Sequence, residues 1–158
     1  MNAPFAPDTL QAGETARLQD RVVQALLKVL PSDAVLYTPE STTPYECDGL
    51  TAYRTRPLCV ALPETETQVQ AVLRACHALQ VPVVARGAGT GLSGGAMPHA
   101  RGVTLSLARF NRILSVNPES RTALVQCGVR NLAISEAAAA HGLYYAPDPS
   151  SQIACTIG

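Results

Sequence analysis

The first regular pattern along the chain is a set of apolar residues spaced three or four positions apart. Pro31 follows this set directly, and its members are Leu18, Val22, Leu26 and Val29–Leu30. Such spacing places the apolar side chains on one face and predicts a helix from about Glu14 to Leu30. A proline at the next position ends the helix.

The segments on either side of this helix lack a regular pattern. Residues 1–13 are rich in proline, alanine and polar residues and are expected to be loose. Residues 31–57 contain four prolines and many polar residues, with a turn at Asp48-Gly49. We therefore expect a long irregular connection here, of the kind that often serves a function.

A second helical pattern lies between two short apolar runs. Residues 58–62 and 81–85 are typical of buried strands, and residues 69–79 carry one apolar helical face. Thr65, with Gln68 three residues later, is the signature of a capping box at a helix start. The segment therefore predicts a β-α-β unit with a right-handed crossover between parallel strands.

The last third of the chain predicts a hairpin and a helix. Residues 113–116 and 122–127 read as strands separated by a turn over residues 117–120, and residues 103–107 read as a strand before them. An alanine-rich helix is expected over residues 131–141, closed by Gly142. The fold class is therefore α+β: a small sheet begun by one βαβ unit and continued by antiparallel strands. The final stretch, residues 144–158, is irregular.

The most specific signal is a glycine-rich loop that follows the second strand of the βαβ unit. Five glycines fall within nine residues, from Gly87 to Gly95. Glycine costs about 1 kcal/mol relative to alanine in regular structure, so such a run is typical of backbone that approaches a ligand closely. Successive N–H groups can then bind a phosphate or pyrophosphate. The candidate binding residues in the loop are Arg86, Gly87, Ala88, Gly89, Thr90, Gly91, Ser93 and Gly94.

The sequence around this loop excludes two other kinds of phosphate site. Residues 89–94 match GxGxxG, but the residues after them lead into a strand instead of a helix, which excludes a Rossmann dinucleotide site. No Gly-Lys-Ser or Gly-Lys-Thr follows, which excludes a P-loop. A flexible loop without a ligand is the remaining alternative. Arg86 could face a pyrophosphate or make a structural salt bridge, and the sequence leaves both open.

Composition excludes several classes of function. Lys+Arg and Asp+Glu number 12 each, so the net charge of zero argues against a nucleic-acid partner. No apolar run reaches the length of a membrane span, and the N-terminus has no secretory signal pattern, which favours a cytoplasmic protein. The five cysteines have no CxxC spacing and the three histidines have no metal-spaced partners. We therefore expect reduced thiols and no metal site.

Three segments of the sequence resemble a known family. Residues 82–95 resemble the pyrophosphate loop of the FAD-binding domain of the vanillyl-alcohol oxidase and p-cresol methylhydroxylase (PCMH) superfamily. Residues 131–135 and 144–158 narrow the resemblance to the FAD-linked subunits of bacterial glycolate oxidase and the related D-lactate and D-2-hydroxyglutarate dehydrogenases. The resemblance implies further FAD contacts in the last segment, from Pro147, Asp148, Ser151, Ala154, Thr156 and Gly158.

The resemblance also implies a domain division. Residues 1–55 would form an N-terminal helix and irregular segment, and residues 56–158 a PCMH-type FAD-binding domain that is truncated at its C-terminal end. The family's substrate domain and catalytic histidines lie downstream, so we assign no catalytic residue here. A chain cut in this way could also fail to fold fully or to turn over alone.

The function implied is oxidation of a small 2-hydroxy acid, glycolate or D-lactate, to the 2-oxo acid. The alternative is a non-catalytic FAD-binding subunit of such a complex. Partners would be the other glycolate oxidase subunits, FAD-binding and iron-sulfur, through which the protein could sit at the inner face of the membrane.

FAD is expected to be held non-covalently. Relatives with covalent FAD carry a histidine four residues after the loop arginine, and here that position is Thr90. Cys127 and Cys155 lie outside the loop, and buried thiols are usually inert.

Overall fold

The computed structural model describes residues 12–158, so residues 1–11 of the segment expected to be loose, residues 1–13, lie outside the described part. Helix α1 runs from Ala12 to Leu26, so residues 12–13 are already helical. It ends four residues before the predicted end at Leu30. The N–H groups of Leu27 and Leu30 still donate to Val23 and Leu26, at 2.9 Å each, so the chain continues as a hydrogen-bonded turn up to Pro31.

A four-stranded sheet forms the larger part of the molecule. Its strands are β1 (Val35–Leu36), β2 (Cys59–Ala61), β3 (Val83–Arg86) and β4 (Val103–Ser106), in the spatial order β1-β2-β4-β3. Strands β2 and β3 both run parallel to β4, and β1 is antiparallel to β2. The βαβ unit is therefore confirmed, but β4 lies between its two strands.

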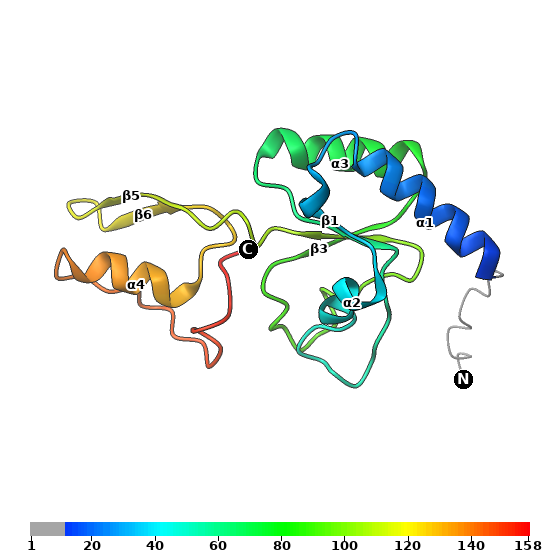
Figure 1. Cartoon of the computed structure of the whole chain (residues 1–158). Helices are drawn as coiled ribbons and strands as arrows, with labels where there is room; N and C mark the ends of the chain where they lie inside the picture. The colour runs from blue at the N-terminus through cyan, green and yellow to red at the C-terminus, as the bar shows by residue number, and fades with distance from the viewer. Residues whose placement is uncertain (1–11) are drawn as a thin grey trace.

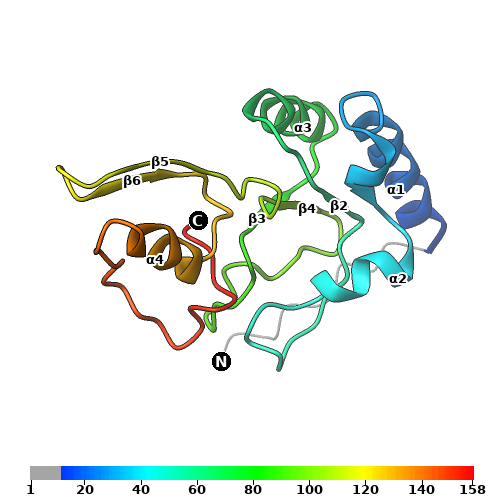
Figure 2. The same cartoon turned by 60° about the vertical axis from the view of Figure 1, so that its left-hand side comes forward.

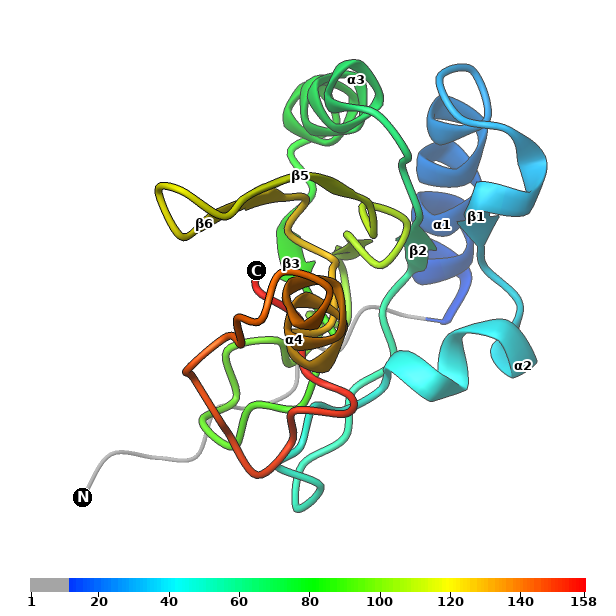
Figure 3. The same ribbon diagram turned by 90° about the vertical axis from the view of Figure 1, so that its left-hand side faces the viewer.

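Two helices cover one face of this sheet. Helices α1 and α3 (Glu66–Ala78) lie side by side above the strands (Figures 1 and 3). Each fully buried Val or Leu there stabilises the fold by about 1.5–3 kcal/mol relative to an exposed one. The core between helices and sheet contains Val22, Val23, Leu26, Val35, Cys59, Ala61, Val72, Cys76, Val103 and Leu105.

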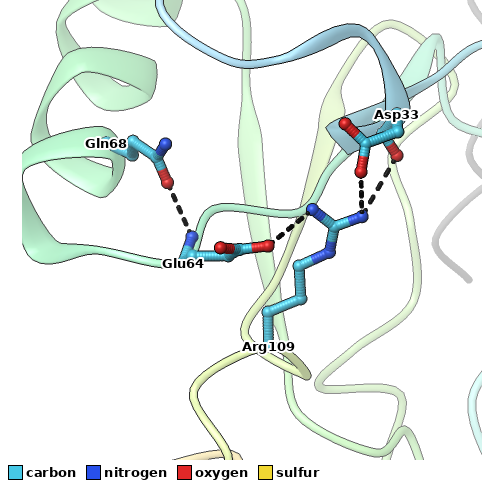
Figure 4. Close-up of polar contacts among 4 residues, drawn as sticks. All are labelled: Asp33, Glu64, Gln68 and Arg109. Carbon is cyan, nitrogen blue, oxygen red and sulfur yellow. Dashed lines mark hydrogen bonds and ion pairs between the residues drawn. The ribbon is translucent and has the colours of Figure 1, made fainter.

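The start of α3 follows the predicted cap in part. Thr65 is the N-cap, and its Oγ1 accepts a hydrogen bond from the Gln68 N–H at 3.2 Å. The Gln68 side chain reaches back to the N–H of Glu64 at 2.7 Å, one residue before the N-cap. Arg109, in the turn after β4, pairs with Glu64 at 2.9 Å and with Asp33 at 2.8 Å (Figure 4). These contacts join the start of α3 to the residues before β1 and to the turn after β4.

The segment predicted to be irregular contains short elements. They are η1 (Ser32–Ala34), the edge strand β1, α2 (Pro39–Thr42) and η2 (Thr43–Tyr45). Helix α2 forms because Thr38 caps it and Pro39 occupies its first turn, where a missing N–H costs nothing. The prediction of irregular chain was wrong here because these elements are too short for periodicity to show.

The second part of the molecule is a hairpin packed near a helix. Strands β5 (Ile113–Asn117) and β6 (Thr122–Val125) pair as predicted, and α4 (Asn131–Ala139) lies beneath them (Figure 2). The chain turns away after α4 at Gly142, whose φ of 67° is the left-handed conformation that glycine favours.

The expectation that these strands continue the first sheet was wrong, because β5 and β6 form a separate two-stranded sheet. The cause is the turn after β4. There the Phe110 N–H donates to Leu107 at 3.0 Å and the chain leaves the sheet (Figure 1).

Candidate cofactor site

The glycine-rich loop begins at the carboxyl end of β3, the outer strand of the four-stranded sheet, as predicted. Two of its residues have left-handed backbone, Gly89 with φ of 72° and Gly94 with φ of 75°. Residues other than glycine rarely adopt these backbone angles, so glycine is needed at both positions. A Cβ placed at Gly91 or Gly95 would meet nothing within 4 Å, so these parts of the loop border open space.

The backbone of this loop offers a run of unpaired donors. Within residues 12–158, none of the N–H groups from Gly89 to Ala96 donates a hydrogen bond to a protein group. The hydroxyl of half-buried Thr90 and that of exposed Ser93 also make no protein hydrogen bond there. Much of this stretch is exposed, and successive N–H groups without protein partners in a glycine-rich turn can bind an anion, so the run fits a ligand such as the pyrophosphate of FAD.

The C-terminal segment lies directly against the start of the loop. The N–H of Ala88 donates to Thr156 Oγ1 at 3.2 Å, and that hydroxyl donates to the Gly158 carbonyl at 3.0 Å. A Cβ at Gly87 would overlap the Gly158 carbonyl oxygen. The structure therefore brings four of the predicted site residues into contact, although 68 residues separate Ala88 from Thr156.

A short backbone pairing holds this C-terminal segment in place. The N–H of Ile157 donates to Val129 at 3.1 Å and that of Gly158 to Cys127 at 2.7 Å. Thr156 bridges antiparallel to Arg130. Figure 2 shows the segment passing between the loop after β3 and α4. The segment thus links the two parts of the molecule beside the candidate site.

The segment from Pro147 to Ser151 lies apart from this contact. Pro147 and Asp148 are exposed, and no hydrogen bond among the described residues joins them to the glycine-rich loop. The Ser151 carbonyl accepts from Ala154 at 2.8 Å and from Cys155 at 2.7 Å, which makes a compact turn. Of the predicted contacts in the last segment, the structure places only Thr156 and Gly158 against the loop among the residues it describes.

This turn also occupies the start of α4. The N–H of Asn131 donates to Cys155 at 3.0 Å and that of Leu132 to Gln152 at 3.1 Å. The first donors of α4 are therefore satisfied within the protein, and this helix start is not an anion site.

Arg86 makes structural contacts on the side of the loop that faces the N-terminal segment. Its Nη1 donates to the Cys47 carbonyl at 2.7 Å, and its guanidinium carbon lies 5.5 Å from the centre of the Tyr45 ring. The partner is a carbonyl rather than the carboxylate of a salt bridge. The guanidinium also lies beside the Cα of Gly89, where a Cβ would overlap it. Arg86 thus ties the loop to residues 45–47.

Gly49, which lies outside the predicted site, also borders the loop. A Cβ on Gly49 would lie 2.7 Å from the carbonyl oxygens of both Thr90 and Gly91. Asp48 beside it is 4% exposed, and its Oδ1 accepts from the Leu50 N–H at 2.9 Å. Its Oδ2 is buried and has no partner within residues 12–158. The Asp48-Gly49 pair predicts a turn from the sequence. No sequence pattern near it indicates that this turn packs against the glycine-rich loop.

A hollow elsewhere on the molecule does not coincide with this site. It has a volume of about 350 Å³, lies between the hairpin and α4, and is lined by residues that include Val116, Ile134 and Tyr145. None of its lining residues belongs to the glycine-rich loop. We place the candidate site at the loop because the unpaired donors lie there.

Two buried thiols lie in the core, away from the loop. Burial raises the pKa of Cys59 to about 12, with a smaller contribution from neighbouring Cys76, whose own pKa is raised by burial to about 11. Within residues 12–158, no group of three His, Cys, Asp or Glu side chains could hold a metal ion. None of the helices in that part of the chain has the length and apolar character needed to cross a bilayer.

Comparison with known sequences bears on the loop and its surroundings. The glycolate oxidase subunit GlcD of Escherichia coli (strain K12) is 64% identical over 137 residues, which cover 87% of this chain and 28% of that protein. D-lactate dehydrogenase of Archaeoglobus fulgidus is 34% identical over 130 residues, which cover 81% of this chain and 27% of that protein. The chain spans less than a third of the length of these two curated relatives.

Solved structures share the fold. Alkyldihydroxyacetonephosphate synthase matches with a TM-score of 0.75 at 19% identity, over 99% of this chain and 32% of that one. p-Cresol methylhydroxylase with substrate bound matches with a TM-score of 0.70 at 26% identity, over 89% of this chain and 27% of that one. These matches confirm the predicted α+β fold of PCMH type.

The sequence profile of one family covers most of the chain. The profile of the FAD binding domain matches residues 57–158, which include the glycine-rich loop, the hairpin, α4 and the C-terminal segment. The resemblance identified from the sequence is confirmed. The chain belongs to the FAD binding domain family.

Proposed function

We propose that this chain holds the pyrophosphate of FAD in an oxidoreductase that converts glycolate or D-lactate to the 2-oxo acid. The observation that carries the proposal is the run of unpaired N–H groups from Gly89 to Ala96, next to the contact of Gly87 and Ala88 with Thr156 and Gly158. The 64% identity to a glycolate oxidase subunit and the 34% identity to a D-lactate dehydrogenase support the substrate class.

In this proposal the residues of the chain bind and orient the cofactor. The loop amides and the hydroxyls of Thr90 and Ser93 donate hydrogen bonds to phosphate oxygens, and the bare Cα atoms of Gly91 and Gly95 allow close approach. When bound, FAD accepts the two electrons that the 2-hydroxy acid loses on becoming a 2-oxo acid. Pro147, Asp148, Ser151 and Ala154 remain proposed contacts, through parts of the flavin beyond the pyrophosphate.

The proposal extends to the organisation of the protein. We assign residues 56–158 to the FAD-binding domain and residues 1–55 to an N-terminal segment whose helix contributes to the same core. FAD is held non-covalently, because Thr90 offers a hydroxyl and no ring nitrogen to bond the flavin. Partner subunits, FAD-binding and iron-sulfur, take up the electrons and could place this cytoplasmic protein at the membrane.

The test uses the complete gene product, purified with FAD and assayed with glycolate, D-lactate and a dye acceptor. We expect dye reduction that depends on flavin and on one of these acids, and none from residues 1–158 alone. Flavin binding without turnover would favour a non-catalytic FAD-holding subunit. A product that binds no FAD would refute the proposal.

Acid precipitation of the same holoprotein tests how the flavin is held. All the flavin should appear in the supernatant if binding is non-covalent. Fluorescence that stays with the protein band on a denaturing gel would show a covalent bond instead.

A further inference from the structure

The turn at residues 47–50 packs against the glycine-rich loop. It lies outside the segment matched by the FAD binding domain profile, which begins at residue 57. Three contacts join it to the loop region: the Cys47 carbonyl accepts from Arg86 at 2.7 Å, Gly49 meets the Thr90 and Gly91 carbonyls, and Leu50 lies about 4.0 Å from the Cβ position of Gly94.

The contact at Gly49 sets the direction of the loop amides. In a planar trans peptide the C=O of one residue and the N–H of the next point in opposite directions. The carbonyl oxygens of Thr90 and Gly91 lie nearest to Gly49. The N–H groups of Gly91 and Leu92 therefore point away from Gly49.

Gly49 can make this contact because it has no side chain. A Cβ there would lie 2.7 Å from each of the two oxygens, against about 3.4 Å for an ordinary contact, so the loop would have to move by about 0.7 Å. Both obstructing atoms belong to backbone, which cannot swing aside as the end of a flexible side chain can. Binding groups generally need to be held to within about 0.5 Å of their productive position.

Asp48 holds the turn in this position. Its Oδ1 accepts from the Leu50 N–H at 2.9 Å, which closes an Asx turn around Gly49. The side chain is buried, so the turn is fixed from the interior of the protein rather than from its surface. The turn and the loop thus form one rigid contact between segments that lie 40 residues apart in the sequence.

We propose that Gly49, held by the Asp48 turn, is a positioning residue of the FAD site: it supports the carbonyl side of the loop and keeps the opposite amides directed at the pyrophosphate. This inference rests on the proposed function, because it assumes that the loop binds FAD. It assigns a role in cofactor binding to a segment that precedes the FAD binding domain match.

The test measures dissociation constants for FAD and for riboflavin, which carries the flavin ring but no phosphate, with the complete gene product. Gly49→Ala should raise the Kd for FAD about tenfold or more and leave the Kd for riboflavin unchanged. Gly13→Ala is the matched control, because Gly13 is exposed near the start of α1 and a Cβ there meets nothing within 4 Å. The melting temperature without cofactor is recorded for each protein.

The outcomes separate this inference from the proposed function. Wild-type protein that binds no FAD refutes the proposed function and this inference with it. Wild-type binding together with an unchanged FAD affinity of Gly49→Ala refutes only the positioning role. Equal loss of FAD and riboflavin affinity also refutes it, because a general loss of structure does not distinguish the phosphates.

A second pair of variants covers the case in which Gly49→Ala fails to fold. Asp48→Ala removes the acceptor of the Leu50 N–H and should raise the Kd for FAD, whereas Asp48→Asn keeps an oxygen in that place and should bind close to wild type. Equal affinities of the two variants would overturn the proposed positioning role.

Discussion

The contact between the glycine-rich loop and the C-terminal segment should respond sharply to one added methyl group. In Gly87→Ala the new Cβ would overlap the Gly158 carbonyl oxygen and lie 2.6 Å from Thr156 Oγ1. One obstructing atom is backbone, and the hydroxyl is held by two hydrogen bonds. The two segments must therefore separate.

The size of the effect follows from these distances. An ordinary contact is about 3.4 Å, so relief at Thr156 Oγ1 needs a movement of about 0.8 Å. The same movement stretches the hydrogen bond from the Ala88 N–H, now 3.2 Å, to about 4 Å, which breaks it. Loss of that bond costs about 1 kcal/mol, and overpacking a close contact costs a further 1–3 kcal/mol. We expect a loss of about 2–4 kcal/mol in the free energy of unfolding.

Urea denaturation followed by far-ultraviolet circular dichroism measures this change. Gly91→Ala is the control, because the same substitution in the same loop meets nothing within 4 Å. Both variants lose a similar amount of chain entropy in the unfolded state, so the difference between them reports the contact. Gly91→Ala should stay within about 0.5 kcal/mol of wild type. The reasoning is refuted if Gly87→Ala is as stable as Gly91→Ala.

Three further changes test other parts of the structure. Gly89→Val should abolish FAD binding by the complete gene product, because valine resists the φ of 72° and its side chain would displace a guanidinium; unchanged affinity in a fluorescence titration would contradict this. At pH 8 a disulfide reagent should label at most three of the five thiols before unfolding and all five in denaturant, because Cys59 and Cys76 are buried with pKa values of about 12 and 11. Arg109→Ala should lower the melting temperature at pH 7. The hydrogen bond from Arg109 lowers the pKa of Asp33 below its ordinary value of 3.8. The stability that the ion pair contributes is therefore present above pH 3.8 and is lost as the pH falls through the lowered pKa. If Arg109→Ala lowers the melting temperature equally at pH 2 and pH 7, the ion pair is not the cause.

Much of the fold and the central part of the candidate site were predictable from local patterns. The helical stripe before Pro31, the cap at Thr65 and the hairpin turn over residues 117–120 each rest on residues within a few positions of one another. The glycine-rich loop was recognisable for the same reason, since dense glycine after an apolar strand reflects a local backbone requirement. These features are set by propensity, capping and periodicity, which act over one or two turns of chain.

The tertiary structure decided which of these elements meet. The insertion of β4 between β2 and β3 depends on pairing partners far apart in the chain, and periodicity carries no register between strands. The structural partner of Arg86 is the Cys47 carbonyl, 39 residues away in the sequence, and no local pattern could identify it. Gly49 and Thr156 contact the same loop although they lie far apart in the sequence. Local patterns could not predict these contacts, because only the folded chain brings the segments together. Local sequence determined most of the helices and strands. The site itself is assembled by contacts between segments far apart in the chain, and such contacts form only when the whole chain folds.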